Sequence, residues 1–213
     1  RYYDDKGRMG VRLGATAQME EKGIRLQLMP ERPTVGYKIF NLNKDNYIFL
    51  GRDSKIQAKV DLASDDNTGL KIYTENQDST MLQDLTVSVY RLDMGELTSV
   101  TPYLPKITGY LNGDYHIVQD QQENISVASD MGIENMTFEG SPIGNIGSEL
   151  TYLMRDDGSH AVEARLMLDD EEFGLLDGSY TSGKNANLID ATLTLTQLPL
   201  SLVNGFVPDK IIG

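Results

Sequence analysis

Hydrophobic and polar residues alternate along most of this chain with a period of two, where a helix would show a period of about 3.6. In the segment KIQAKVDL, residues 55–62, every second residue is apolar and the residues between them are mostly polar. Such alternation predicts strands that have one dry face and one wet face. The pattern recurs often enough to predict roughly 12 to 15 short strands.

The dry face of the predicted sheet is aliphatic, with small alanines between the larger side chains. One strand is expected to place Val11, Leu13 and Met19 together on this face. An open face of this kind would accept apolar chains, whereas two such faces covering each other would form a β-sandwich. The side chains expected to line it are Val11, Leu13, Ile24, Leu26, Leu28, Ile56, Val60, Leu62, Val87, Val89, Ile125, Val127, Leu150, Val162, Leu166, Leu168, Leu193 and Leu195.

Turn-forming residues separate the alternating segments. The stretches SDDNTG (64–69), RDDGSH (155–160) and SGKNAN (182–187) supply the Gly, Asn and Asp residues that tight hairpins need for positive φ. Helical spacing of apolar residues occurs only in 95–104 and 199–206, where one or two helical turns are expected before a proline. The predicted fold is therefore antiparallel β with two short helical corners.

The chain contains an internal repeat. The segment LDMGELTSVTPYLPKITG (92–109) aligns with LTQLPLSLVNGFVPDKIIG (195–213) after one inserted residue, with apolar residues and a proline in matching positions. We therefore expect two β units of about 100 residues, 1–109 and 110–213, each ending in a corner of helix, proline and glycine. The corner residues are Pro105, Gly109, Leu111, Gly113, Pro199, Pro208 and Gly213.

Charge and composition narrow the function. The formal net charge of −13 disfavours binding to phosphate backbones and to anionic lipid headgroups, so nucleic acid is excluded as a partner. The sequence contains no cysteine, which removes disulfides, thiol catalysis and zinc–thiolate sites. The apolar content of 39% with 24% charged residues is typical of a soluble, folded chain.

Candidate catalytic or metal-binding residues are few. His116 and His160 lack a nearby Cys or a second His, so neither predicts a catalytic or metal site. The segment 61–69 lacks the ligand order of a calcium loop, and the carboxylates of 169–172 adjoin a glycine as in a solvated turn. We therefore predict no enzyme activity, no metal and no cofactor.

Two segments carry a family resemblance. LPKITGYLNGDYHI (104–117) and LPLSLVNGFVPDKIIG (198–213) resemble the recurring phrase of the TamB/AsmA-like envelope proteins, in which L-P-L-x-L and then P-x-x-x-G-x-L-x-G precede each β segment. The first copy departs from it, with Gly95 and Glu96 where the second has Leu198 and Pro199. The matching residues are Gly109, Leu111, Gly113, Tyr115, Ile117, Leu198, Pro199, Leu200, Leu202, Pro208 and Gly213.

The resemblance implies a fold and a role. Members of the family are long, curled β structures that span the periplasm of Gram-negative bacteria between an inner-membrane anchor and the outer membrane. Their apolar groove is thought to carry phospholipid acyl chains, and a β-barrel partner links them to outer-membrane protein assembly and secretion. The chain is then expected to be a piece of a longer protein whose cut strand edges can pair with each other.

Two functions from different classes remain open on the sequence. The first is a segment of a lipid-carrying bridge, which needs an elongated, curled antiparallel or mixed sheet with an open groove. The second is a non-catalytic β-sandwich module for binding or adhesion in a secreted multidomain protein. They differ in whether the dry face is open or sealed by a second sheet.

Overall fold

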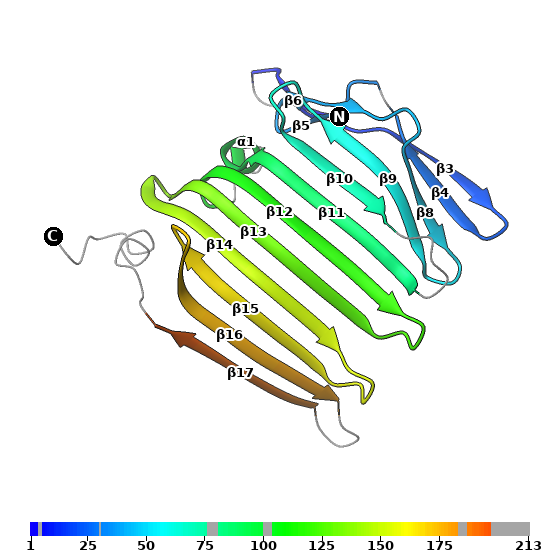
Figure 1. Ribbon diagram of the computed structural model, residues 1–213. Coiled ribbons are helices and arrows are strands. Elements are labelled where there is room, and N and C mark those ends of the chain that lie inside the picture. The colour runs from blue at the N-terminus through cyan, green and yellow to red at the C-terminus, as the bar shows by residue number, and fades with distance from the viewer. Residues whose placement is uncertain (4–5, 30, 76–80, 100–103, 183–186, 197–213) are drawn as a thin grey trace.

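The computed structural model describes residues 1–213 except 4–5, 30, 76–80, 100–103, 183–186 and 197–213 (Figure 1). The predicted all-β, antiparallel class is confirmed, and neither of its two sheets closes on itself. The described ranges contain seventeen strands and one helix, α1 (Met94–Ser99). The strands beyond the expected number are pairings of only two residues, which are too short to produce an alternating pattern.

The strands form a small and a large sheet. The small sheet consists of β1 (Tyr2–Tyr3), β2 (Met9–Arg12), β5 (Thr34–Val35) and β6 (Lys38–Ile39). The large sheet, called the ladder below, consists of β3 (Ala15–Glu20), β4 (Gly23–Leu28), β7 (Asn41–Leu42), β8 (Tyr47–Gly51), β9 (Ile56–Ala63), β10 (Gly69–Thr74), β11 (Met81–Asp93), β12 (Ile107–Asp120), β13 (Ile125–Phe138), β14 (Ser141–Met154), β15 (His160–Leu168), β16 (Glu171–Ser182) and β17 (Asn187–Leu195).

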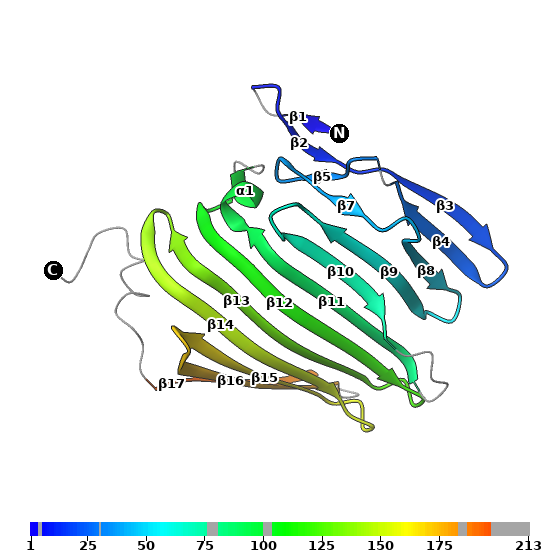
Figure 2. The same cartoon turned by 45° about the horizontal axis from the view of Figure 1, so that its top comes forward.

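The ladder is a meander in which sequence neighbours pair in space. From β8 to β17 every strand is antiparallel to the next one along the chain, and β4 and β3 extend the sheet beyond β8. In Figure 2, β11 to β14 are seen face-on while β15 to β17 are nearly edge-on, so the ladder curls toward its C-terminal edge. Short connections such as the two-residue β13–β14 and β15–β16 turns favour nearest-neighbour pairing, because a short loop brings its two strands side by side in antiparallel order.

The hairpin turns use the residues that the sequence pattern indicated. Asp169 and Asp170 both have positive φ, 49° and 67°, and connect β15 to β16 in two residues. Asn67, with φ of 64°, and Gly158, with φ of 75°, occupy the β9–β10 and β14–β15 turns. Asp, Asn and Gly tolerate this left-handed region better than other residues. The acidic stretch 169–172 is thus a hairpin turn and the start of β16, as expected.

Bulges bend the ladder at one end of its strands. The register shifts between Val89 and Leu92, between Thr108 and Tyr110, and between Ile133 and Met136, next to α1 or to the short β13–β14 turn. Each extra residue bends its strand and increases the local twist. The bend gathers a hydrophobic cluster from five strands, formed by Met136, Ile143, Leu168 and Phe173 with Ile107, Ile133, Phe138, Ile146 and Leu166 around them.

Polar side chains on neighbouring strands satisfy the bulged backbone. Asn112 Oδ1 accepts a hydrogen bond from the N–H of Arg91 at 2.9 Å, and Asn145 Oδ1 accepts one from Asn135 at 2.9 Å. Arg91 and Asn135 are bulged residues with φ of 50° and 51°. Asp169 Oδ1 in turn accepts a hydrogen bond from the N–H of Asn145. In both bulges, an asparagine side chain on the neighbouring strand thus accepts the hydrogen bond of the bulged backbone N–H.

The N-terminal segment differs from the expected single strand. Val11 lies in β2 of the small sheet, whereas Met19 lies in β3 of the ladder, and Leu13 lies in neither. The chain leaves one sheet and enters the other at Leu13 and Gly14, so the alternation that joined Val11 to Met19 spans a break. The expectation of one strand over 11–19 was wrong, because alternation alone does not reveal a change of sheet.

The first repeat corner forms a short helix as expected. Asp93 Oδ1 caps α1 by accepting a hydrogen bond from the N–H of Glu96 at 3.0 Å, and Thr98 Oγ1 donates to the carbonyl of Ile107 at 3.2 Å. The second corner, including Pro199, Pro208 and Gly213, lies outside the described residues. The expected boundary at 109/110 falls inside β12, across which the ladder continues without a break.

Candidate functional site

One row of side chains crosses the ladder on a single face. Antiparallel register places Val60, Ile72, Val87, Tyr115, Ser129, Leu150, Ala164, Leu176 and Leu193 opposite one another in succession from β9 to β17. Residues opposite each other in a ladder point to the same side. We call the side that carries this row the apolar face and the other side the polar face. With strands about 4.8 Å apart, the row is roughly 38 Å long.

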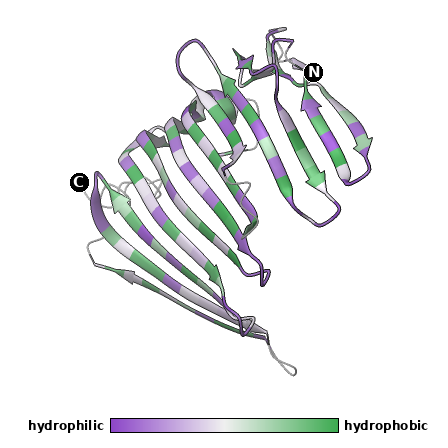
Figure 3. Ribbon diagram, turned by 45° about the vertical axis from the view of Figure 1, so that its right-hand side comes forward, coloured by the Kyte–Doolittle hydropathy of each residue, from purple (hydrophilic) through white to green (hydrophobic). Residues whose placement is uncertain are grey.

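Sixteen of the eighteen predicted lining residues lie on the apolar face. The pairing registers place Ile24, Leu26 and Leu28 there through β8 and β3, and the same registers extend to Leu195 in β17. Figure 3 shows the corresponding alternation of apolar and polar residues along the long strands. The two exceptions are Val11, in the small sheet, and Leu13, which is 52% exposed. The residues brought together are Ile24, Leu26, Leu28, Ile56, Val60, Leu62, Val87, Val89, Ile125, Val127, Leu150, Val162, Leu166, Leu168, Leu193 and Leu195.

The apolar face is covered around β9 and open at the C-terminal edge. Around β9, Val60 and Leu62 pack in a cluster with Val35 and Phe40. Val35 belongs to β5, and Phe40 directly follows β6. Val60 is consequently only 3% exposed, whereas Leu193 in β17 is 54% exposed. Among the described residues no second sheet covers the ladder from β11 to β17. At the opposite edge of the ladder, Met19 in β3 lies on the same face and is 73% exposed. The face is therefore accessible at both edge strands and covered around β9.

A hollow of about 410 Å³ lies on the accessible part of the apolar face. Val162, Leu176, Ile189 and Ala191 supply most of its apolar wall. Gly178 contributes no side chain. The register places it opposite Val162 on β15 and opposite Ala191 on β17. The missing side chain leaves room at the surface of the sheet.

Three polar side chains of the apolar face border this hollow: Tyr152, His160 and Tyr180. Tyr152 Oη lies 2.6 Å from His160 Nδ1, and the two rings stack with centroids 5.8 Å apart. The Tyr180 ring lies on the other side of the imidazole, with its centroid at 5.4 Å. Sequence reasoning placed His160 after a turn and missed this grouping. The signal was available in the alternation, since the hairpin pairs His160 with Met154 and places it on the same face as Tyr152.

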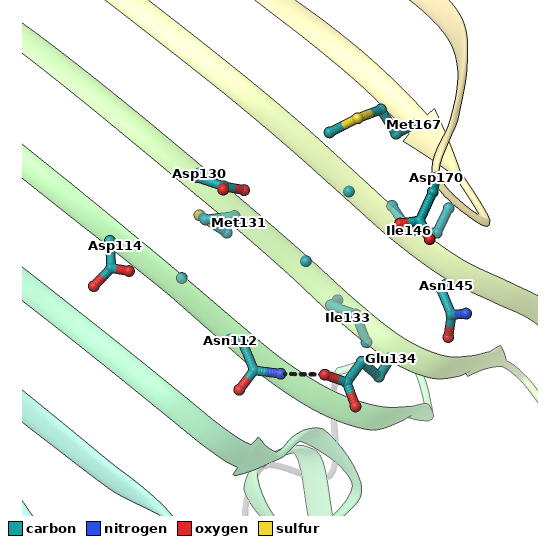
Figure 4. Close-up of a pocket in the computed structure, with 13 residues that line it drawn as sticks. Asn112, Asp114, Asp130, Met131, Ile133, Glu134, Asn145, Ile146, Met167 and Asp170 are labelled. Carbon is teal, nitrogen blue, oxygen red and sulfur yellow. Dashed lines mark hydrogen bonds between the residues drawn. The ribbon is translucent and has the colours of Figure 1, made fainter.

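The polar face carries a different hollow, of about 300 Å³, over β12 to β15 (Figure 4). Its floor includes Gly132 and Gly147, which pair with each other and leave a gap between longer side chains. Asn112 Nδ2 donates to Glu134 Oε1 at 3.0 Å at one border of the hollow (Figure 4). Within the described ranges no three His, Cys, Asp or Glu side chains converge to hold a metal ion. The acidic residues here are a solvated surface that keeps the two faces of the ladder chemically distinct.

The other residues considered for chemistry are dispersed. His116 lies on the polar face, where its Nε2 is 2.8 Å from Asp84 Oδ1. In the β9–β10 turn, Asp66 is bonded to Lys38 at 2.7 Å and to Ser64, and the Lys38 hydrogen bond holds the pKa of its carboxyl far below the usual range. The ion pair of that carboxylate with Lys38 links the β9–β10 turn to β6. In the part of the chain that the structure describes, no helix is long and apolar enough to cross a membrane.

Comparison with known proteins finds no match for this chain among protein families, curated proteins or solved structures.

Proposed function

We propose that this chain is a segment of an envelope protein whose apolar face carries phospholipid acyl chains between the inner and outer membranes. The observation that supports it is the continuous row from Val60 to Leu193, which is aliphatic for most of its length and ends at the exposed Leu193 in β17. A chain that needed the row only as a core would cover it along its whole length.

The energetics favour such a surface. Exposing an acyl chain of 16 carbons to water costs about 13 kcal/mol, at about 0.8 kcal/mol for each CH₂ group. A sheet face that replaces water along the path lowers this barrier without any chemical step. The row of roughly 38 Å exceeds the length of one such chain, so a lipid tail can move along it while remaining in apolar contact.

The cellular setting of this proposal rests on the family resemblance. We place the chain in the periplasm, within a longer protein anchored in the inner membrane, with a β-barrel partner in the outer membrane and a role in outer-membrane protein assembly. In this proposal the polar face contacts water, in keeping with its carboxylates and amides.

Lipid extraction tests the proposal directly. The purified chain is extracted and analysed by mass spectrometry, and its affinity for the hydrophobic probe N-phenyl-1-naphthylamine is measured by fluorescence. We expect co-purified phospholipid and saturable probe binding. Leu193→Asp, on the open part of the apolar face, should weaken probe binding by about fivefold or more, because an unpaired carboxylate next to the apolar chain must be desolvated.

The matched control is Thr194→Asp, which places the same charge on the same exposed strand but on the polar face. It should leave probe affinity unchanged. Absence of both lipid and probe binding in the unsubstituted chain would contradict the proposal and favour an adhesion module. Equal losses in both variants would also count against it, since the face would then have no special role.

A further inference from the structure

The three polar residues at the apolar hollow form an unusual group for such a surface. Tyr152, His160 and Tyr180 come from three successive strands, β14, β15 and β16, and all are partly buried on the apolar face. A sheet face that served only to hold hydrocarbon would have no use for an imidazole flanked by two phenols. Pockets with an apolar lining and a few convergent polar groups are instead typical of ligand sites.

The hydrogen bond between Tyr152 and His160 determines what the imidazole presents. A neutral imidazole has one nitrogen that donates and one that accepts. When the Tyr152 hydroxyl donates to Nδ1 over 2.6 Å, the ring proton is on Nε2, on the opposite side of the ring. Within the described ranges neither His160 Nε2 nor the Tyr180 hydroxyl has a hydrogen-bond partner. In that tautomer two donors, His160 Nε2 and the Tyr180 hydroxyl, are available beside an apolar hollow.

The surroundings of these donors select the class of ligand. Val162, Leu176, Ile189 and Ala191 offer hydrocarbon contact to one end of a molecule, and the donors offer hydrogen bonds to an acceptor at the other end. Asp190 also borders the hollow, but the register places it opposite Ser179 on the polar face. The matching ligand has an aliphatic chain that ends in a carbonyl or carboxylate oxygen.

We infer that His160, oriented by Tyr152 and assisted by Tyr180, binds the carbonyl end of an acyl chain whose tail lies in the hollow. This inference rests on the proposed function and adds to it a defined binding site on the apolar face. The acyl carbonyl can belong to a free fatty acid or to the ester of a phospholipid, and the recognised chemistry is the same.

The test uses the whole chain with palmitate labelled with ¹³C at its carboxyl carbon. Palmitate affinity is measured by displacement of N-phenyl-1-naphthylamine, and the ¹³C chemical shift reports the hydrogen bonding of the bound carboxyl group. His160→Phe and Tyr180→Phe should each weaken palmitate binding about five- to tenfold, as expected for one lost hydrogen bond, and should move the ¹³C signal toward its free position. Direct binding of the probe itself should change less than about twofold.

Tyr73→Phe is the matched control, because Tyr73 lies on the polar face of β10, away from the hollow and outside the apolar row. It should leave palmitate affinity and the ¹³C shift unchanged. Unaltered palmitate binding in both His160→Phe and Tyr180→Phe, with normal probe binding, would contradict the binding of the acyl carbonyl by His160. It would leave the proposed lipid function intact. Failure of the unsubstituted chain to bind either probe or palmitate would instead remove the proposed function itself.

A second arm separates the two sources of the carbonyl. The same variants are titrated with dihexanoyl phosphatidylcholine below its critical micelle concentration. Weakened binding of both ligands identifies an ester carbonyl as an accepted acceptor, and weakened binding of palmitate alone identifies a free carboxylate. Either result supports the binding of an acyl carbonyl by His160, whereas equal affinity of all variants for both ligands contradicts it.

Discussion

Asn145 Oδ1 accepts a hydrogen bond from the backbone N–H of Asn135 at 2.9 Å, so a side chain on β14 completes the bulge in β13. The Asn145 backbone N–H is bonded in its turn to Asp169 Oδ1. These contacts join β13, β14 and the β15–β16 turn at the end of the ladder where the hydrophobic cluster around Ile143 and Phe173 forms. The bend of the sheet therefore depends on polar contacts at the ends of its strands as well as on apolar packing.

Replacing Asn145 tests this contribution. Asn145→Ala should lower the free energy of unfolding by about 1–2 kcal/mol, because the bulged N–H of Asn135 loses its acceptor. Urea unfolding followed by circular dichroism measures the change. Asn187→Ala, at an exposed position at the start of β17, should cost much less. Equal stability of the two variants would show that water replaces the side-chain acceptor fully.

Gly109 is required by the bulge in β12. Its φ is 122°, and an added Cβ would lie 2.7 Å from both Glu134 O and Ile133 Cγ2. Gly109→Ala should therefore destabilise the fold by about 2–3 kcal/mol, through backbone strain and the clash together. Gly178→Ala provides the comparison, since its nearest atoms would be 3.8 Å away in ordinary contact. A difference below about 0.5 kcal/mol between the variants would contradict this reading.

The ion pair between Asp66 and Lys38 makes stability depend on pH. The Lys38 hydrogen bond is the main cause that lowers the pKa of Asp66 from its ordinary 3.8. Because the folded-state pKa lies below the unfolded one, the pair stabilises the fold above about pH 4 and loses this effect as the pH falls toward the folded-state pKa.

Asp66→Asn should accordingly reduce stability by at most about 1 kcal/mol at pH 7, since the Asp66 side chain is 57% exposed and screened by water. The difference from the unsubstituted chain should shrink between pH 4 and pH 2. Urea unfolding at pH 7, 4 and 2.5 measures it, with Asp177→Asn on the polar face of β16 as control. A difference that grows on acidification would refute the assignment.

The outer edge of β17 is expected to pair with a second copy of the chain. Among the described residues β17 pairs only with β16, and its sequence NLIDATLTL contains no Lys, Arg or Pro to discourage pairing. Sedimentation velocity should show association that increases with protein concentration. Thr192→Lys combined with Thr194→Lys should weaken it about tenfold, because paired edges would bring like charges together.

The control for this experiment is Thr151→Lys in β14, a strand whose two edges are both paired. It changes the charge of the polar face without touching the edge. Association that is equally weakened by Thr151→Lys would point to general repulsion rather than to edge pairing.

Local pattern was sufficient for the strands and for one of their faces. Alternation at Ile56, Val60 and Leu62 specifies which side chains share a face, because the period of a strand is two whatever its partners are. The turns at Asn67, Gly158 and Asp169 were equally local, since they need only residues that tolerate positive φ. Sixteen of the eighteen residues predicted for the face therefore lie on it, whereas Ile72 and Leu176 of the row were not among those predicted.

Order and curvature depended on residues that are distant in sequence. The break at Gly14 assigns Val11 to the small sheet, and nothing in the alternation marks it. The bulge caps of Asn112 and Asn145 were not predicted, because an asparagine in a strand reads only as a polar residue until its neighbour's register is known. Register is set by the whole ladder, and a shift of one residue would reverse every face.

The sequence by itself determined that this protein is a set of antiparallel strands with one aliphatic side, because hairpin chemistry and a two-residue period are local properties. Only the tertiary structure decided that those sides join into one row that is covered near β9 and open near β17. It alone placed Tyr152, His160 and Tyr180 around a common hollow. Both outcomes depend on how many strands pair in sequence and where bulges bend them, and these are properties of the assembled sheet.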